Sequence, residues 1–213
     1  MTSEEKKIND GVLFWPGNPE LKALKLKSHN LSLEYSNTRE DEVERRAKIL
    51  ADMVGELGEN VFIQGPVFFH YGCHTSIGKG CFFNYNLTIQ DDAHVTIGEG
   101  CAFGPNVTIV TPVHPMISKE RHEIRIAEGN IRGLCYAKPV NIGKGCWIGA
   151  NVVVCPGVTI GEDCVIGAGS VVTKDIPAGT FAAGVPCRVV REITEKDSMK
   201  YKPEILADNE LVE

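Results

Sequence analysis

The stretch NIGKGCWIGANVVVCPGVTIGEDCVIGAGSVV, residues 141–172, repeats with a period of six residues. An aliphatic residue stands at each repeat, and four of the six are followed by glycine: Ile142, Ile148, Val154, Ile160, Ile166 and Val172. Such a period is the signature of a parallel β-helix, in which each unit supplies a short strand and a turn, and three units complete a triangular coil of about 18 residues. The aliphatic side chains point inward, and glycine takes corners that need positive φ or close approach. The stretch therefore predicts a mainly β protein.

The same repeat runs earlier in the chain, through Ile77, Phe83, Ile89, Ile97, Phe103 and Ile109. Its phase slips by two residues between Ile89 and Ile97. A second inward position follows the aliphatic one by four residues and holds Cys81, Leu87, Cys101, Val107, Cys146, Val152, Val158 and Cys164. Four of the eight cysteines are thereby predicted to be small buried hydrophobic residues. The absence of a CxxC pair argues against a zinc ribbon.

One long excursion, residues 111–139, interrupts the repeat. It reads TPVHPMISKERHEIRIAEGNIRGLCYAKP, is rich in charge and begins directly after a regular coil. Loops of this length on a rigid scaffold commonly carry function. The excursion is therefore the first place to look for a site.

Residues 1–58 follow a different pattern, with helical periodicity and many charges. The spacing of Val43, Ala47, Leu50, Val54 and Leu57 predicts an amphipathic helix over residues 38–57 with Thr38 as its N-cap. Leucines between residues 21 and 33 indicate an earlier, less regular helix. We expect an N-terminal helical segment (1–58), a β-helix domain (59–192) with the excursion loop (111–139), and a C-terminal tail (193–213).

Bulk composition excludes several classes of protein. With 213 residues, 43% of them hydrophobic and 23% charged, the chain is an ordinary globular one. The net charge of −6 argues against non-specific nucleic-acid binding. The sequence has no signal peptide and no apolar run long enough for a membrane span, so we expect a cytoplasmic protein without membrane contact.

Five segments resemble the maltose and galactoside O-acetyltransferases, a branch of the left-handed β-helix acyltransferases. They are NYNLTIQDD (84–92), GPNVTIVTPVHP (104–115), KPVNIGKGCWIGANVVVCPGVTIG (138–161), VIGAGSVVTKDIP (165–177) and AAGVPCRVVRE (182–192). The likeness covers nearly the whole chain, N-terminal helices included. It implies a left-handed coil, acetyl-CoA as co-substrate, a small-molecule acceptor, no metal, and a homotrimer with its active sites in clefts between neighbouring coils.

The resemblance also assigns roles to residues. His114 matches the catalytic base, which takes the proton of an acceptor hydroxyl during direct transfer. The acceptor site is expected at His70, Asn84, Asp92 and Cys135. A backbone N–H near Gly149 and Ala150 is expected to stabilise the oxyanion. The coenzyme A cradle is expected to comprise Trp147, Gly149, Ala150, Ala168, Thr173, Lys174, Arg188 and Arg191, whose cations would meet phosphates.

Three departures from the family leave the acceptor open. The galactoside branch has Ser at the position of His70. It also has an early acidic residue, which is missing or shifted in this chain, where Pro16 stands near that position. At the position of Cys135, relatives have Glu or Met. A glucose- or maltose-like sugar is the first expectation, while Arg121, Arg125 and Arg132 of the longer loop suggest a more anionic acceptor. An amine, an antibiotic hydroxyl and a non-catalytic β-helix trimer are the alternatives. A metal site at His70, Cys73 and His74 is disfavoured because the spacing fits no standard site.

Overall fold

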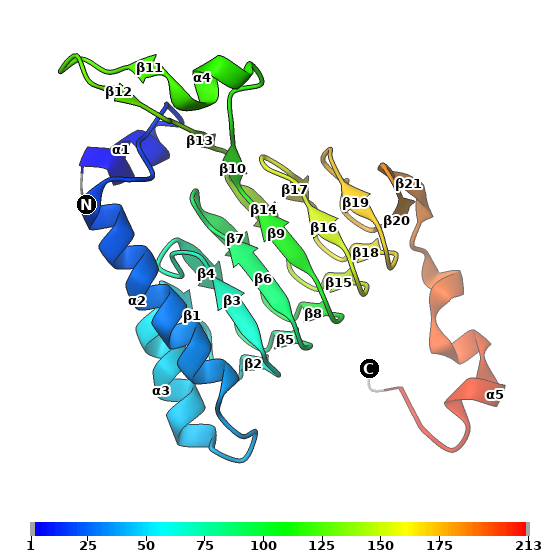
Figure 1. Cartoon of the computed structure of the whole chain (residues 1–213). Coiled ribbons are helices and arrows are strands. Elements are labelled where there is room, and N and C mark those ends of the chain that lie inside the picture. Colours follow the sequence, from blue (N-terminus) through cyan, green and yellow to red (C-terminus); the bar gives the residue numbers. More distant parts are fainter. Residues whose placement is uncertain (1–2, 212–213) are drawn as a thin grey trace.

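The structure is a computed structural model that describes residues 3–211. Residues 1–2 and 212–213, the outer ends of the predicted helical segment and tail, lie outside this range. Helices cap one end of a three-sided coil, the excursion loop projects beside them, and the C-terminal tail stands off the opposite end (Figure 1). Within residues 3–211, no helix is both long and apolar enough to cross a membrane.

Three sheets form the sides of the coil. Face A consists of β1 (Glu56–Leu57), β4 (Thr75–Ile77), β7 (Val95–Ile97), β14 (Val140–Ile142) and β17 (Thr159–Ile160). Face B consists of β2 (Phe62–Ile63), β5 (Phe82–Phe83), β8 (Ala102–Phe103), β15 (Trp147–Ile148), β18 (Val165–Ile166), β20 (Thr180–Gly184) and the antiparallel β21 (Cys187–Glu192). Face C consists of β3 (Val67–Phe69), β6 (Leu87–Gln90), β9 (Thr108–Val110), β16 (Val153–Val154) and β19 (Val171–Val172).

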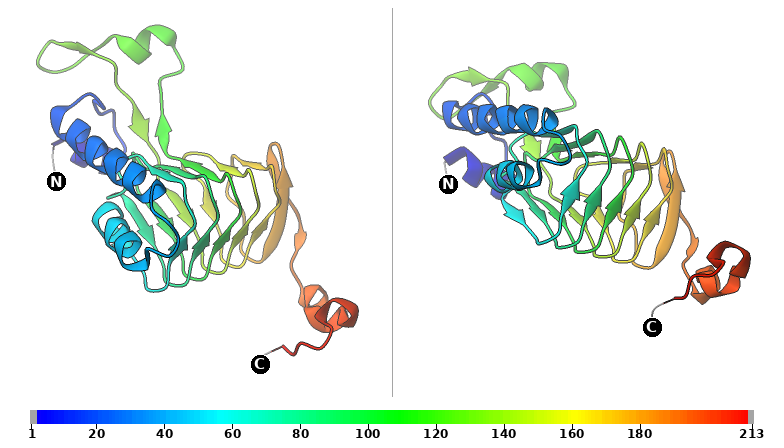
Figure 2. Two further views of the ribbon diagram at one scale, coloured as in Figure 1. Left: turned by 60° about the horizontal axis from the view of Figure 1, so that its bottom comes forward. Right: turned by 90° about the horizontal axis from the view of Figure 1, so that it is seen from below.

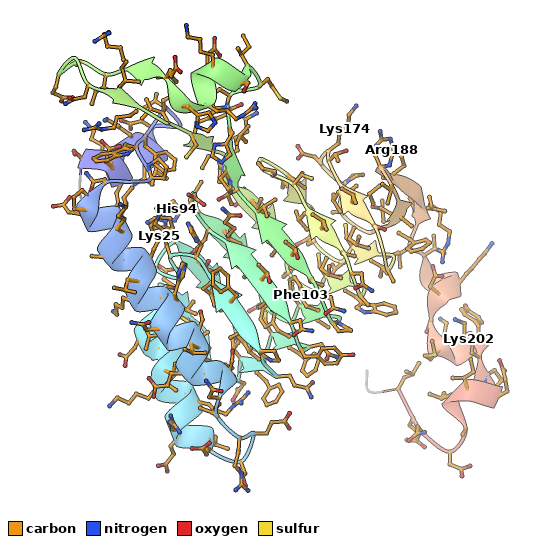
Figure 3. The ribbon with its side chains drawn as sticks, viewed as in Figure 1. Lys25, His94, Phe103, Lys174, Arg188 and Lys202 are labelled. Carbon is orange, nitrogen blue, oxygen red and sulfur yellow. The ribbon has the colours of Figure 1, made fainter. Side chains whose placement is uncertain are left out.

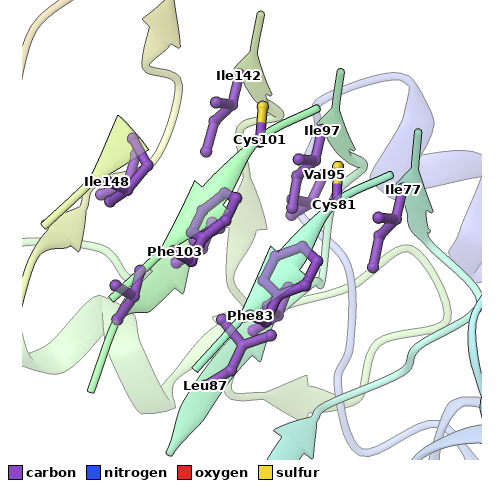
Figure 4. Packing of buried hydrophobic residues seen from close by; sticks show 14 of the residues in the cluster. Ile77, Cys81, Phe83, Leu87, Val95, Ile97, Cys101, Phe103, Ile142 and Ile148 are labelled. Carbon is purple, nitrogen blue, oxygen red and sulfur yellow. The ribbon is translucent and has the colours of Figure 1, made fainter. Parts of the chain in front are cut away.

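The core is a set of columns in which each inward residue stacks on its equivalent one coil later. Ile97 pairs in register with Ile77 and Ile142, and the rings of Phe83 and Phe103 stack with centroids 4.5 Å apart (Figure 4). Every residue that the repeat places inward is buried, which confirms the predicted period. Apolar burial along these columns drives formation of the coil.

Four cysteines form one inward column: Cys81, Cys101, Cys146 and Cys164. Each is at most 1% exposed, and each thiol donates to a carbonyl oxygen of the next coil at 3.1 Å. They are small core residues, as the repeat predicts. Glycine after the aliphatic position allows the backbones of neighbouring coils to approach closely. A Cβ on Gly98 would lie 2.5 Å from the Lys144 backbone nitrogen.

The N-terminal segment closes the open end of the coil (Figure 2). It contains α1 (Ser3–Asn9), α2 (Pro19–Ser36) and α3 (Val43–Met53). Ser28 donates to the Phe69 carbonyl at 2.9 Å, while Ser32 and Ser36 accept from the N–H groups of Phe69 and Val67 at 3.1 Å. Hydroxyls one helical turn apart therefore satisfy the exposed edge of β3, which would otherwise be free to pair with another chain.

The helix predicted over residues 38–57 is shorter, because both of its predicted ends are wrong. The Thr38 hydroxyl donates to the Tyr35 carbonyl at 2.6 Å and so belongs to the end of α2, and Glu42 precedes α3 instead. At the other end, the backbone becomes extended at Val54 and enters β1. The coil thus begins at Glu56 rather than at residue 59.

The excursion has structure of its own. β10 (Pro112–Val113) pairs antiparallel with β13 (Tyr136–Ala137) to form a stem. Beyond it lie α4 (Ser118–His122), β11 (Ile124–Arg125) and β12 (Ile131–Arg132). The tail after β21 contains η1 (Glu195–Asp197), η2 (Met199–Tyr201) and α5 (Pro203–Leu206).

Candidate active site

Three predicted site residues follow strands of face C, at the ends of those strands that lead toward face A. His70 follows β3, Asp92 lies just beyond β6, and His114 follows β9 and β10. Because β3, β6 and β9 are parallel and in register, their carboxyl ends share one edge of the sheet. We call this edge of the three-sided coil, between faces C and A, the C–A corner.

Asp92 sits in the phase slip of the repeat and is only 3% exposed. Its Oδ2 has no hydrogen-bond partner among residues 3–211. Burial, and next the charge of Asp91, raise the pKa of Asp92 to about 6. Asp91, by contrast, accepts from the Tyr71 N–H at 2.7 Å and the Thr75 hydroxyl at 2.8 Å. Asp91 therefore holds the turn, while Asp92 keeps an unused acceptor.

His70 is half-buried beside α2. Its Nδ1 lies 3.4 Å from Nε2 of His29. Burial, and next the nearby Lys25 ammonium, lower the pKa of His70 to about 4. His70 is thus a neutral imidazole at physiological pH and serves as a hydrogen-bonding group rather than a cation.

Cys135 reaches the same corner from the far side of the loop. It is 2% exposed, and its N–H donates to the Phe14 carbonyl at 3.2 Å. Burial, and next Asp92, raise the pKa of Cys135 to about 12. The thiol therefore stays protonated, which is unfavourable for a nucleophile.

His114 is exposed at the start of the loop. It lines a cavity of about 280 Å³ together with Pro16, Arg121, His122, Gly133 and Leu134. The N-terminal segment supplies one wall of this cavity and the loop supplies the others. An imidazole at such a mouth is accessible to a substrate hydroxyl.

Two further side chains lie at this corner that the sequence analysis does not predict. Lys25 on α2 donates to the Pro16 carbonyl at 3.0 Å and lies 5.9 Å from the Tyr71 ring centroid. Tyr71 is 2% exposed, and its hydroxyl has no partner among the described residues. No repeat or motif points to either residue: packing of α2 against the coil brings Lys25 to the site, and Tyr71 lies on the coil just after β3.

Asn84 and part of the cofactor set lie at a different edge, where face B leads into face C. Asn84 follows β5, Gly149 and Ala150 follow β15, and Ala168 lies just beyond β18. A Cβ on Gly149 would lie 2.6 Å from the Ala168 nitrogen, so Gly149 is needed for coil packing. Its N–H donates to the Ile166 carbonyl at 2.8 Å, which leaves the Ala150 N–H as the candidate oxyanion donor. We call this edge the B–C corner.

The remaining cofactor candidates are divided. Thr173 and Lys174 follow β19 and so lie at the C–A corner, whereas Arg188 is the second residue of β21 (Figure 3). Neither Lys174 nor Arg188 has a carboxylate within 4.0 Å in the described part of the chain, and the Arg188 guanidinium donates only to the neighbouring Cys187 carbonyl. Arg191 instead forms a bidentate pair with Asp197 at 2.7 and 2.8 Å.

Trp147 stands on the outer surface of face B and is 59% exposed. Together with Arg191 it lines a cavity of about 360 Å³ whose other walls are Val165, Phe181, Ile193 and Asp197. Unpaired cations, small corner residues and an exposed indole fit a phosphate-bearing thioester with a long flexible arm. Within residues 3–211, no group of three His, Cys, Asp or Glu side chains is placed to hold a metal ion.

Two family models match the chain. The model described as bacterial transferase hexapeptide (six repeats) covers residues 139–174, and the maltose acetyltransferase hexapeptide capping motif covers residues 7–58. The first match lies within the later turns of the coil, and the second spans the capping helices α2 and α3.

Known relatives extend the match to most of the chain. Galactoside O-acetyltransferase from Escherichia coli K12 is 43% identical over 196 residues, which are 92% of each chain. The structure of a maltose O-acetyltransferase from Clostridium difficile 630 superposes with a TM-score of 0.83 at 36% identity, covering 91% of this chain and 99% of that one. A galactoside acetyltransferase in complex with coenzyme A superposes with a TM-score of 0.83 at 38% identity over the whole of both chains.

The β-helix coil and the N-terminal helices that close its end together define a hexapeptide-repeat acyltransferase. The chain belongs to the maltose and galactoside O-acetyltransferase family. This confirms the resemblance drawn from the motifs, the left-handed parallel β-helix and the assignment as an acyltransferase. Acetyl-CoA as co-substrate is supported by the relative that holds coenzyme A.

Proposed function

We propose that this enzyme transfers the acetyl group of acetyl-CoA directly to a hydroxyl of a small, sugar-like acceptor, with His114 as general base. The observation that carries the proposal is the position of His114 on the lining of a cavity beside Lys25 and Cys135, the two residues that bring the unpartnered carboxylate of Asp92 close to it. A base and a hydroxyl-binding group at one site are what acetylation of an alcohol needs.

The reaction proceeds by direct transfer, without an acyl-enzyme, through a tetrahedral intermediate. An imidazole nitrogen of His114 takes the hydroxyl proton as the oxygen bonds to the thioester carbon. The Ala150 N–H stabilises the oxyanion. The carbon–sulfur bond then breaks, and His114 returns the proton to the leaving thiolate. The protonated, buried Cys135 supports direct transfer, because it offers no thiolate for an acyl-enzyme.

The cradle for coenzyme A combines both corners of face C. Lys174 and Arg188 bind phosphates, and Gly149, Ala150 and Ala168 let the pantetheine arm lie against backbone. Thr173 and Trp147 border the arm, and Arg191 joins the phosphate group only when it releases Asp197. Charge-assisted hydrogen bonds to phosphate are the strong contacts in such a site.

The active enzyme is a homotrimer. Outward residues of face A are polar, namely Glu56, Ser76, Thr96, Asn141 and Thr159. Outward residues of face B are apolar, namely Phe62, Phe82, Ala102, Trp147, Val165 and Phe181. Phe62 and Phe82 are 41% and 40% exposed and stack at 5.8 Å. A continuous apolar row that is exposed at Phe62, Phe82 and Trp147 supports an interaction surface. A second copy placed on it would bring the B–C corner of one chain to the C–A corner of the next.

The acceptor is not a simple galactoside. His70, Pro16 and Cys135 border the site, and they present an imidazole, a carbonyl and a thiol that stays protonated. Discrimination among sugars depends on pairing each hydroxyl with a fixed partner. This set of partners favours glucose- or maltose-like acceptors over a β-galactoside.

Release of free thiol from acetyl-CoA with a panel of sugars, amines and antibiotic alcohols tests the function. Acceptor-dependent release, an acetyl ester in the product and its loss in His114→Ala are expected. Release only with amines would change the reaction class, and no release with any acceptor would favour a non-catalytic coil. A kcat/KM for a β-galactoside at or above that of every other sugar would contradict the acceptor assignment.

A further inference from the structure

Three cations surround Trp15 and Pro16 at the wall of the His114 cavity. The Lys25 ammonium donates to the Pro16 carbonyl at 3.0 Å. The Arg132 guanidinium lies 4.7 Å from the Trp15 ring centroid. Arg121 lines the cavity itself, together with Pro16 and His114. Loop and helix thus direct three positive groups to one side of the acceptor site.

None of these cations has a carboxylate within 4.0 Å among residues 3–211. The partners of Arg121 are the carbonyls of Pro115 and Met116, at 3.2 and 2.9 Å, which engage only Nη1. Arg132 donates from Nη1 to the Ile131 carbonyl, and its buried Nε has no partner in the described part of the chain. A guanidinium has five donors, so both side chains keep unused hydrogen-bonding capacity.

A shortage of acids does not explain this arrangement, because the chain has a net charge of −6. On the coil, Lys79 pairs with Glu99 and Lys144 with Glu162, each at 3.3 Å. Near the cavity, the Glu4 carboxylate is occupied by Lys7 and by the Trp15 N–H, both at 2.7 Å. Within the described residues, Arg121 and Arg132 therefore have no ion-pair partner, and the carboxylate whose charge acts on Lys25, Asp92, lies beyond 4.0 Å.

Asp92, whose carboxyl lies close enough to Lys25 for their charges to interact, supplies a different contact. Asp92 is buried and unpartnered at Oδ2, which suits a hydroxyl donor. An acceptor bound here consequently meets a hydroxyl-binding carboxylate near Lys25 and the guanidinium groups of Arg121 and Arg132 from the loop.

We propose that the physiological acceptor is a sugar that carries an oxyanion, either a carboxylate or a phosphate, bound by Arg121, Arg132 and Lys25 while its hydroxyl faces His114. This inference rests on the proposed O-acetyltransferase activity and names the acceptor class of the same site.

Arg125 provides a matched control. It lies in the same loop, is exposed, and donates to the Gly129 carbonyl at 2.7 Å across the turn between β11 and β12. It does not line the cavity. Arg125→Gln removes the same charge from the loop as Arg121→Gln, so the pair separates local binding from long-range attraction.

The test compares glucose with glucuronate and glucose 6-phosphate as acceptors at fixed saturating acetyl-CoA. We expect kcat/KM to be about 10- to 100-fold higher for at least one charged acceptor, the range of a charge-assisted hydrogen bond. The two charged sugars distinguish carboxylate from phosphate. Arg121→Gln should lower kcat/KM for the charged acceptor by about tenfold more than for glucose, whereas Arg125→Gln should change both by the same small factor.

Equal kcat/KM for neutral and charged sugars would overturn the inference and leave the O-acetyltransferase intact. An Arg121→Gln variant that raises the KM for acetyl-CoA equally with both acceptors would assign the cation to the cofactor and also overturn it. Failure to acetylate any sugar, with acetyl-CoA still bound in calorimetry, would defeat the proposed function and this inference with it.

Discussion

Asn84 and Asp92 lie beyond opposite ends of strand β6 (Leu87–Gln90). At a rise of about 3.3 Å per residue, they are on the order of 20 Å apart along face C. The sequence assigns both to the acceptor site, yet one chain cannot bring both to a single small acceptor. We therefore propose that a neighbouring chain contributes its Asn84 to the site.

Mixing two inactive variants tests this arrangement. His114→Ala and Asn84→Ala trimers should each be inactive, but unfolding and refolding them together should restore about a quarter of the wild-type activity. Random assembly gives that fraction of sites in which one chain supplies His114 and its neighbour supplies Asn84. Activity that stays at the level of the single variants would show that both residues serve the same chain, and light scattering of an active monomer would exclude the trimer.

Replacement of the base should affect turnover and not cofactor binding. His114→Ala is expected to lower kcat by roughly 10²–10⁴-fold, the usual contribution of a positioned general base. The Kd for acetyl-CoA, measured by calorimetry, should stay nearly constant because the imidazole acts on the acceptor hydroxyl. His122→Ala is a suitable control, since His122 lines the same cavity. A His114→Ala enzyme within about threefold of wild type would mean that another group takes the proton.

Much of the fold follows from one period in the sequence. Ile77, Ile97 and Ile142 stack because a six-residue unit returns each to the same face, so their burial can be predicted without a template. His114 is likewise marked by its place at the start of the long excursion that interrupts that period. Local periodicity is sufficient to predict which residues are buried wherever neighbouring coils repeat the same contacts.

The remaining features depend on contacts between distant segments. Lys25 reaches the site only through the docking of α2, and Thr38 ends α2 instead of beginning α3 because Tyr35 offers its carbonyl first. The pairing of Arg191 with Asp197 joins the last strand to the tail. None of these contacts produces a regular spacing of residues from which it could be predicted.

The cations of the cradle should contribute unequally. Replacing Lys174, Arg188 and Arg191 together with Ala should raise the KM for acetyl-CoA without loss of the fold. Lys174→Ala or Arg188→Ala alone should raise it about tenfold or more, whereas Arg191→Ala should have a smaller effect because Asp197 competes for its guanidinium. The effect of Arg191→Ala should grow in an Asp197→Asn background. An unchanged KM in the triple variant would remove these residues from the cradle.

Ionisation of the Asp92 carboxyl should lower the free energy of unfolding of the enzyme. Its pKa is raised from 3.8 to about 6 in the folded chain. Between these values the folded protein binds the proton more tightly than the unfolded one, so stability falls as pH rises through this window. A shift of about two units corresponds to about 3 kcal/mol lost by pH 7 relative to pH 3.5.

Asp92→Asn mimics the protonated carboxyl and should remove this loss. Chemical unfolding should show the variant more stable than wild type by up to about 3 kcal/mol at pH 7, with the difference vanishing near pH 3.5, while acceptor KM rises because the hydroxyl loses its carboxylate. Asp91→Asn is the contrasting variant: its oxygens already bond Tyr71 and Thr75, so it should destabilise at every pH. A stability difference between Asp92→Asn and wild type that stays constant from pH 4 to 7 would show that the Asp92 carboxyl is not the group that titrates.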